Sequence, residues 1–205
     1  MLMCKKCISI EVDPVFDEEE MSYVCSKCGS PIDEVDDEII PTVSLLLGKG
    51  YNPVMYYSGK PFTKEESIIM TADIDCFDVK VKIIDKPDCY SFILLDTEEL
   101  PASALLYIQS YYFGNCISCT TIDKILGRAA NRPDKITQIL TDYSDNKSIL
   151  ALYPTDEIEG AISLLSSAGE IDNEPFKGYN LLCHIRKELY VAASKLPEVK
   201  EFDNR

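Results

Sequence analysis

The N-terminal part of the chain contains Cys4-Lys5-Lys6-Cys7, followed after 17 residues by Cys25-Ser26-Lys27-Cys28-Gly29, and these two cysteine pairs determine its expected structure. In a Cys-x-x-Cys pair the two intervening residues form a tight turn, so that both sulfur atoms face one ion. Two such pairs present four thiolates in a tetrahedron, which is the ligand set of structural zinc. The sequence therefore predicts one zinc ion bound by Cys4, Cys7, Cys25 and Cys28.

Four thiolates leave no open coordination position, so this ion cannot activate water. Its expected contribution is folding free energy, on the order of 10 kcal/mol for structural zinc. Two other interpretations of the cysteines stay open, namely ordinary thiol or disulfide pairs, and iron in place of zinc. Lys5, Lys6 and Lys27 either offset the negative charge of the centre or are simply solvated.

Residues 1–40 are predicted to form a zinc ribbon with an acidic linker, and residues 41–205 a separate α+β domain. Within the ribbon we expect strands at 7–12 and 21–25, turned around Asp13-Pro14 and the acidic run 17–20. The linker is the acidic stretch 33–38, which ends at Pro41.

The larger domain is predicted to combine a small antiparallel sheet with a helical C-terminal part. Runs rich in β-branched and aromatic residues predict strands at 67–75, 78–84 and 90–96, with a further short strand at 150–153. Capping residues and helical spacing predict helices at 42–47, 101–112, 120–130, 133–143, 155–167 and 179–195. In the last helix the apolar stripe consists of Leu182, Ile185, Leu189 and Ala193.

The charge is strongly negative and unevenly distributed. The net charge of the chain is −15, and residues 1–41 hold 11 acidic and 3 basic residues, a net charge of −8. Such a field repels phosphate backbones and attracts basic surfaces, so nucleic acid is not the expected partner. Apolar runs are too short for a transmembrane helix or a secretory signal, and nine cysteines is an odd number. We therefore expect a reducing, cytoplasmic location.

The N-terminal segment resembles the zinc-ribbon modules found at the ends of many bacterial, archaeal and phage proteins, with Cys25-Ser26-Lys27-Cys28-Gly29 as the best-matching knuckle. This likeness covers about a sixth of the chain.

A fainter likeness involves Leu47-Gly48-Lys49-Gly50-Tyr51 and Tyr56-Tyr57-Ser58-Gly59-Lys60. These stretches are similar to uncharacterised proteins of phages and Gram-positive bacteria, in which a ribbon is followed by a Gly-Tyr and then a Cys-Ser-Gly-His motif. Tyr57 and Lys60 replace the cysteine and histidine of that motif, so any activity of those side chains would be absent. The likeness implies a phage or mobile-element origin.

A third Cys-x-x-Cys pair, Cys116-Ile117-Ser118-Cys119, has three open interpretations. It is half of a second metal site, a redox pair at a helix N-terminus, or two unconnected thiols. A second metal site would have to be completed by one of four residues elsewhere in the chain, which are Cys76, Cys89, Cys183 and His184.

No catalytic group assembles in the sequence. His184 is the sole histidine, and neither a serine elbow nor a phosphate-binding loop is present, since Gly48-Lys49-Gly50 lacks the spacing. Asp73, Asp75 and Asp78 fit a solvated strand end better than a cation site. The pair of helices around Arg128, Arg132 and Lys135 is a weak match to a helix-turn-helix, and we expect Ile125, Leu126, Ile136, Ile139 and Leu140 to be core residues.

The leading hypothesis is a non-enzymatic, acidic zinc-ribbon interaction protein. If phage-encoded, it would bind a basic surface of a host nucleic-acid enzyme or defence complex in the host cytoplasm and modulate or inhibit it. Two alternatives remain: a nucleic-acid-binding transcriptional regulator, and an enzyme with a second metal or thiol site at Cys116 and Cys119.

Overall fold

The structure is a computed structural model with helices and antiparallel sheets, which confirms the α+β class. No helix in the described part of the chain combines the length and apolar content that spanning a bilayer requires. The structure describes residues 1–10, 12–19, 21–59, 68–72, 81–85, 91–110, 112–113, 117–129, 135–154 and 174–202.

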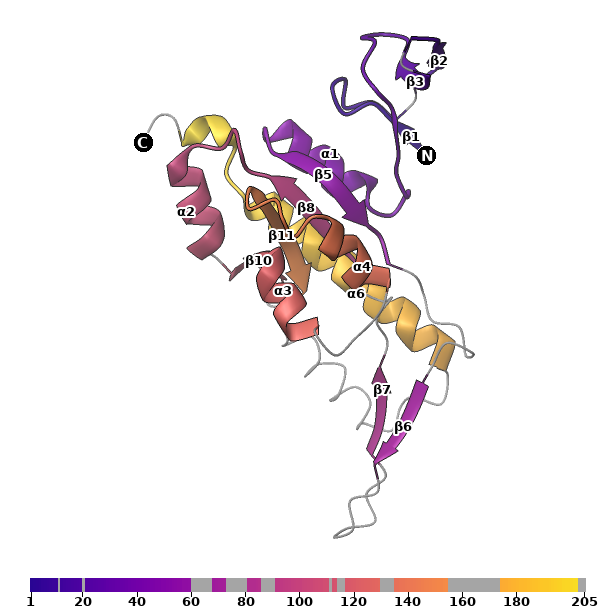
Figure 1. The fold of residues 1–205 in the computed structure, drawn as a ribbon, viewed down its shortest axis with the longest axis vertical. Helices are drawn as coiled ribbons and strands as arrows, with labels where there is room; N and C mark the ends of the chain where they lie inside the picture. The colour runs from indigo at the N-terminus through magenta and orange to yellow at the C-terminus, as the bar shows by residue number, and fades with distance from the viewer. Residues whose placement is uncertain are drawn as a thin grey trace.

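A five-stranded antiparallel sheet forms the centre of the molecule (Figure 1). Its order is β5 (Asn52–Tyr57), β8 (Phe92–Asp96), β11 (Ile149–Pro154), β10 (Ile117–Thr121) and β9 (Tyr112–Phe113). Strands that follow one another in the sequence are therefore not always neighbours. Two of the three interior strands, β8 and β11, are buried along nearly their whole length.

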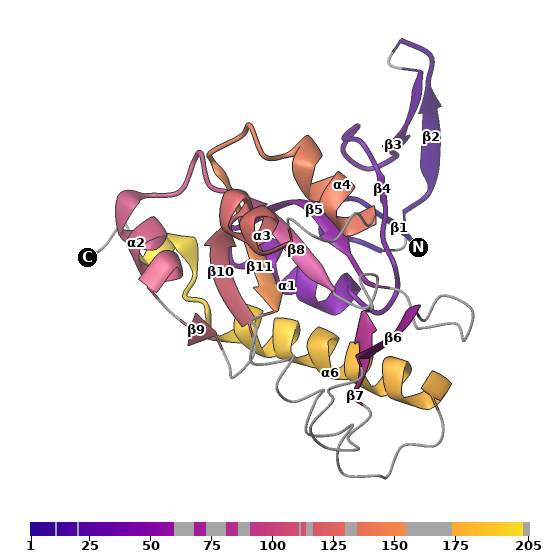
Figure 2. The same cartoon turned by 60° about the horizontal axis from the view of Figure 1, so that its bottom comes forward.

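Each face of this sheet packs against helices. Because side chains alternate along β8, Ile93 and Leu95 face one core cluster, while Phe92 and Leu94 face the other. The first cluster includes residues of α1 (Ile40–Gly48), α2 (Ala102–Ser110) and α6 (Glu174–Lys195). The second includes residues of α3 (Ile122–Ala129) and α4 (Lys135–Asp142). Figure 2 shows the sheet between α6 and the α3–α4 pair.

The stripe predicted for the last helix is confirmed. Leu182, Ile185, Leu189 and Ala193 are all fully buried on α6. After this helix the chain passes through a short 3-10 helix, η2 (Val199–Glu201). Lys49, directly after α1, donates hydrogen bonds from its ammonium group to carbonyl oxygens at the C-terminal end of α6. The stretch Gly48-Lys49-Gly50 is thus a structural contact between two helix ends.

The N-terminal ribbon projects from one end of this body (Figure 1). Its two hairpin strands are β2 (Pro14–Asp17) and β3 (Ser22–Cys25), and its base is the pair β1 (Leu2–Met3) and β4 (Asp33–Glu34). Met3 is fully buried in the first core cluster of the main body. The base of the ribbon and the domain therefore share apolar packing.

Two sequence-based predictions about strands are wrong. The sequence predicts a strand at 7–12, but Cys7 belongs to a tight turn and the first hairpin strand is β2, which pairs with β3. Three strands were expected to pair into one sheet. Instead β6 (Ile68–Ala72) pairs only with β7 (Val81–Asp85) among the described strands, and β8 lies between β5 and β11. The helix predicted at 155–167 lies outside the described residues.

Candidate metal centre

The four predicted ligands, Cys4, Cys7, Cys25 and Cys28, come together at the base of the ribbon. All four Sγ atoms lie within 4.8 Å of one another. The Sγ atoms of Cys4 and Cys28 are 3.5 Å apart, and those of Cys7 and Cys25 are 3.9 Å apart. Cys4 and Cys25 are buried, with Val12 beside them, while Cys7 and Cys28 are partly exposed.

These distances fit a tetrahedral ion. A Zn–S bond of about 2.3 Å implies an S···S separation of about 3.8 Å along each edge of the tetrahedron. A disulfide needs about 2.05 Å, so the four residues are free thiols rather than two disulfides. The donor set is therefore compatible with a zinc-ribbon-like site that could hold one metal ion.

The electrostatics of the sulfur cluster also favour a cation. Hydrogen bonding to Cys28 and burial raise the pKa of Cys7 to about 12, and burial raises the pKa of Cys4. Hydrogen bonds from the hydroxyl and backbone of Ser30 lower the pKa of Cys28 to about 6. Four thiols so close together cannot all ionise without a positive ion between them, and such an ion would be closed to water by its four ligands.

The two cysteine turns share one equivalent backbone hydrogen bond. The N–H of Cys4 donates to the carbonyl oxygen of Ser9 at 2.9 Å, and the N–H of Cys25 donates to that of Ser30 at 2.8 Å. In both turns the acceptor lies five residues after the first cysteine. Ser30 also contacts Cys28, a role that the ligand spacing alone did not reveal, although Ser9 and Ser30 occupy equivalent positions.

The residue after each second cysteine has a left-handed backbone. Gly29 has φ +68°, and Ile8 has φ +50° at the equivalent position. Glycine adopts this conformation without cost, whereas a β-branched residue is strained there. The first turn is therefore the less favourable of the two.

Lys5 joins the metal-site turn to the main body. Its ammonium group lies 2.6 Å from a carboxylate oxygen of Asp33 and 5.4 Å from the centre of the Tyr56 ring on β5. Lys6, in the same turn, is exposed. Of the three lysines near the cysteines, Lys5 thus has a specific structural contact.

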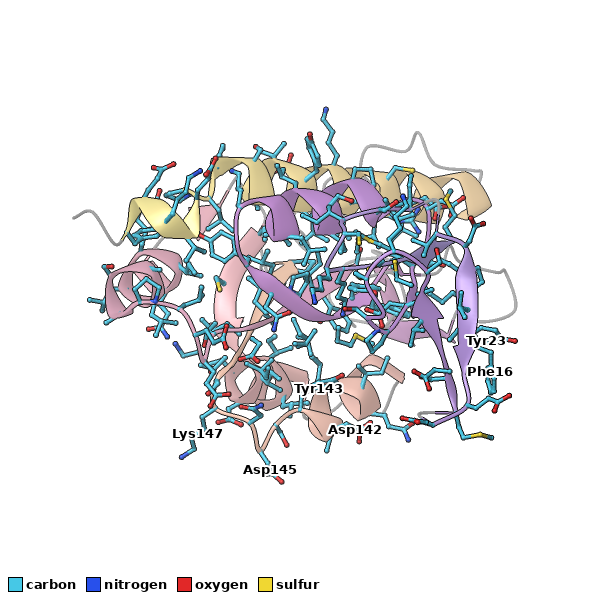
Figure 3. The ribbon with its side chains drawn as sticks, turned by 90° about the horizontal axis from the view of Figure 1, so that it is seen from above. Phe16, Tyr23, Asp142, Tyr143, Asp145 and Lys147 are labelled. Atoms are coloured by element: carbon cyan, nitrogen blue, oxygen red, sulfur yellow. The ribbon has the colours of Figure 1, made fainter. Side chains whose placement is uncertain are left out.

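The hairpin that rises from the metal site carries exposed aromatic side chains. Phe16 and Tyr23 are paired across β2 and β3, with ring centres 5.3 Å apart in an edge-to-face arrangement. Phe16 is 46% exposed and Tyr23 is 60% exposed. Figure 3 shows both rings at the outer side of the hairpin. Sequence analysis missed this pair because the neighbouring acidic residues dominate the segment.

Cys119 has the environment of a core residue. It lies on β10, its side chain is in the first core cluster, and burial raises its pKa to about 12. Cys183 is exposed on α6. The remaining candidates for a second metal site lie outside the described residues: Cys76, Cys89, Cys116 and the side chain of His184.

Some of the other residues singled out in the sequence lie within the described part of the chain. Ile125 and Leu140 are buried in the second core cluster, with Leu126 and Ile139 packed against it, which confirms these as core residues. The carboxylates Asp73, Asp75 and Asp78, the residue Arg132, and the side chains of Arg128, Lys135 and Ile136 lie outside the described part of the chain.

Residues of the two stretches Leu47-Gly48-Lys49-Gly50-Tyr51 and Tyr56-Tyr57-Ser58-Gly59-Lys60 make structural contacts. Gly50 has φ +90° and lies so close to Val199 that a Cβ atom there would be 3.2 Å from the Cβ of Val199. The buried Tyr51 donates its hydroxyl to the carbonyl oxygen of Pro197 at 3.0 Å. Ser58 donates to a carboxylate oxygen of Asp36, and its own carbonyl oxygen accepts from Arg186 at 2.8 Å. Lys60 lies outside the described residues.

Comparison of the chain with models of protein families, with curated proteins and with solved structures gave no match. The case for function therefore rests on the geometry of the ribbon and its hairpin.

Proposed function

We propose that this protein is a non-enzymatic interaction protein, in which a zinc-stabilised ribbon presents an acidic hairpin to a basic surface of a partner protein. The proposal rests on the uneven distribution of exposed apolar side chains, which are concentrated in the ribbon. Ten large apolar side chains are exposed among the described residues, and eight of them belong to residues 1–23. Single exposed apolar side chains are ordinary, but their concentration in one acidic segment supports an interaction site.

The charge of the surrounding residues indicates the sign of the charge on the partner surface. Residues 1–41 contain 11 acidic and 3 basic residues, and Asp13, Glu18 and Glu19 are exposed on or beside the hairpin. A negative field of this kind speeds association with a basic surface and repels a phosphate backbone.

A zinc ion would supply rigidity rather than chemistry. Cys25 is both a candidate ligand and the last residue of β3, where it pairs with Pro14 at the start of β2. A metal bound to Cys25 therefore fixes the base of the hairpin. A surface that is ordered before binding loses less conformational entropy on association.

The class of partner follows from the same charge argument. Nucleic-acid enzymes and defence complexes expose basic grooves, and an acidic hairpin with apolar side chains can occupy such a groove. A phage-encoded protein would meet these targets in the host cytoplasm and would modulate them by blocking the groove.

The first experiment identifies the partner by site-specific crosslinking in the native cell. A photo-reactive phenylalanine derivative replaces Tyr23 on the hairpin in one variant and Tyr190 on α6 in the control, since both tyrosines are exposed. We expect an adduct with one basic protein from position 23 and none from position 190.

The second experiment measures the binding of the purified partner against salt. We expect affinity to fall as sodium chloride rises from 50 to about 500 mM, because screening weakens exposed charge pairs. The double variant Glu18→Lys/Glu19→Lys should bind roughly tenfold more weakly. The control Asp142→Lys/Asp145→Lys changes the net charge equally at a separate exposed turn (Figure 3) and should bind normally. Affinity that is indifferent to salt contradicts the proposal.

A further inference from the structure

One edge of the hairpin is already occupied. The N–H of Cys25 donates to the carbonyl oxygen of Ser30, and the carbonyl oxygen of Tyr23 accepts from the N–H of Ile32 at 3.3 Å. Residues 30–32 thus extend the hairpin on the β3 side, around the bridge between Val24 and Pro31. Strand β2 forms the opposite edge, and it pairs only with β3 among the described strands.

The same two hydrogen bonds fix which backbone groups of β2 point outward. Because the N–H of Cys25 and the carbonyl of Tyr23 point away from β2, the pairs Pro14–Cys25 and Phe16–Tyr23 are of the non-hydrogen-bonded type. In such a pair the N–H and C=O of both residues point to the outer edges. The N–H and C=O of Phe16 therefore face outward, and no hydrogen bond among the described residues reaches them.

The side chains of β2 leave this edge accessible. Val15 is 51% exposed on one face, and the rings of Phe16 and Tyr23 are exposed on the other. Natural edge strands are commonly protected by lysines, by bulges or by a covering segment. Strand β2 has no lysine, and its one proline is its first residue, Pro14.

We infer that β2 is a docking edge for an extended, cationic segment of the partner protein, which pairs with the backbone of Phe16 as an additional strand. This inference rests on the proposed function, since it specifies how the partner is held. In this arrangement, strand addition supplies main-chain hydrogen bonds, and the side chains that flank them supply specificity.

The side chains of β2 define what that segment should carry. A residue opposite Phe16 has its own side chain on the face of the Phe16 and Tyr23 rings, where an arginine or lysine would lie against aromatic surface. On the other face its neighbours would meet Val15 and Asp17, which favours apolar and basic side chains. A second copy of this chain is disfavoured as the occupant, because two hairpins of the same high negative charge repel each other.

The test uses the zinc-loaded full chain labelled with ¹⁵N and the synthetic peptide acetyl-Arg-Val-Arg-Val-Arg-Val-Arg-amide. The matched control peptide has glutamate in place of every arginine. Amide hydrogen exchange is followed by NMR for Phe16 and for Val15. With the arginine peptide at saturation, the Phe16 amide should exchange at least tenfold more slowly, because it gains an acceptor. The Val15 amide should change little, since it already points toward Val24.

Each possible outcome has a separate meaning. Binding of the arginine peptide without protection of the Phe16 amide overturns strand addition and leaves the proposed function standing. Equal binding of the glutamate peptide contradicts the charge argument of the proposed function as well. No binding of either peptide overturns the strand proposal. Protection of Phe16 that depends on protein concentration without peptide would instead indicate pairing between two copies and would also overturn it.

A side-chain variant separates the ring pair from the backbone edge. Tyr23→Leu removes one ring but leaves the outward groups of Phe16 in place, so the peptide should bind about fivefold more weakly while the Phe16 amide is still protected. Tyr190→Leu removes an exposed tyrosine from α6 and should leave both readouts unchanged.

Discussion

The ammonium nitrogen of Lys49 lies 2.6 Å from the carbonyl oxygen of Ser194, a residue 145 positions later in the chain. The same nitrogen contacts the carbonyl oxygens of Ala193 at 3.0 Å and Leu196 at 2.5 Å. These oxygens end α6, where the helix leaves carbonyl groups without intrahelical donors and where the helix dipole is negative. The ammonium group of Lys49 thus caps the C-terminal end of α6.

Lys49→Met should destabilise the zinc-loaded protein by about 2 to 3 kcal/mol, because three carbonyl oxygens lose a charged donor. Chemical denaturation followed by circular dichroism measures the change. Lys195→Met is the matched control, since Lys195 is exposed in the last turn of the same helix, and it should change stability by less than about 0.5 kcal/mol. Equal effects of the two variants would show that the contact is not specific.

Cys28→Ser should abolish binding of the ion, because the tetrahedron loses one thiolate and structural zinc contributes on the order of 10 kcal/mol. Elemental analysis should give at least one zinc per wild-type chain and one fewer for the variant. Hydrogen exchange should rise across β2, β3 and their connections, with smaller changes in β8 and β11. Cys183→Ser, at an exposed cysteine, is the control and should keep wild-type zinc content. A fully folded ribbon without metal would refute the site.

The two left-handed positions of the metal site predict opposite effects of substitution. Gly29→Ala should destabilise the ribbon by about 1 kcal/mol, because φ +68° is unfavourable for alanine although the space around it is open. Ile8→Gly should stabilise it by up to about 1 kcal/mol, because φ +50° strains isoleucine. Competition for zinc with a chelator, at fixed pH, reports both changes. Ile8→Val keeps the β-branch and should behave like the wild type.

Lys5→Ala should destabilise the attachment of the ribbon by about 1 kcal/mol, since it removes an ion pair with Asp33 and a contact with the Tyr56 ring. Local hydrogen exchange of β1 and β4 measures this, and zinc content should stay constant. Lys6→Ala removes the same charge from the same turn. A comparable effect of Lys6→Ala would mean that overall charge, and not the Lys5 contact, is responsible.

Cys119 and Cys183 should differ sharply in reactivity toward iodoacetamide at pH 8. Burial keeps Cys119 inaccessible and raises its pKa to about 12, so almost none of it is thiolate, whereas Cys183 is exposed. Peptide mapping should find Cys183 modified and Cys119 protected until the protein unfolds. Because burial raises the pKa of Cys119 from its ordinary value of 9.0 to about 12, its contribution to stability should be lost as pH rises from about 9 toward 12. Rapid modification of Cys119 would contradict its placement in the core.

Local patterns in the sequence predicted the clustering of the four cysteines and the helices of the described part of the chain. The spacing of Cys4, Cys7, Cys25 and Cys28 determines the site because each pair is made within four residues. The stripe on α6 was also predictable, since helical periodicity reports a buried face directly. These features depend on residues that are close in sequence.

Features that depend on distant residues were not predicted. The place of β8 between β5 and β11 depends on pairing with residues 35 or more positions away, which no local pattern encodes. The role of Lys49 could not be predicted, because the carbonyl oxygen that it contacts belongs to Ser194, 145 positions later in the chain. The first hairpin strand was misplaced because Cys7 was assigned to a strand as well as to a metal-binding turn, and the turn geometry prevails. In each case tertiary contacts override local preference.

The burial of Met3 has a consequence for the whole protein. Met3 immediately precedes Cys4, the first of the four clustered cysteines, yet its side chain belongs to the core beneath the five-stranded sheet. If an ion is bound by the four cysteines, movement of Cys4 on its loss would draw an apolar side chain out of the main body. Depletion of metal at the base of the ribbon would then shorten the lifetime of the entire chain and not only of its first thirty or so residues.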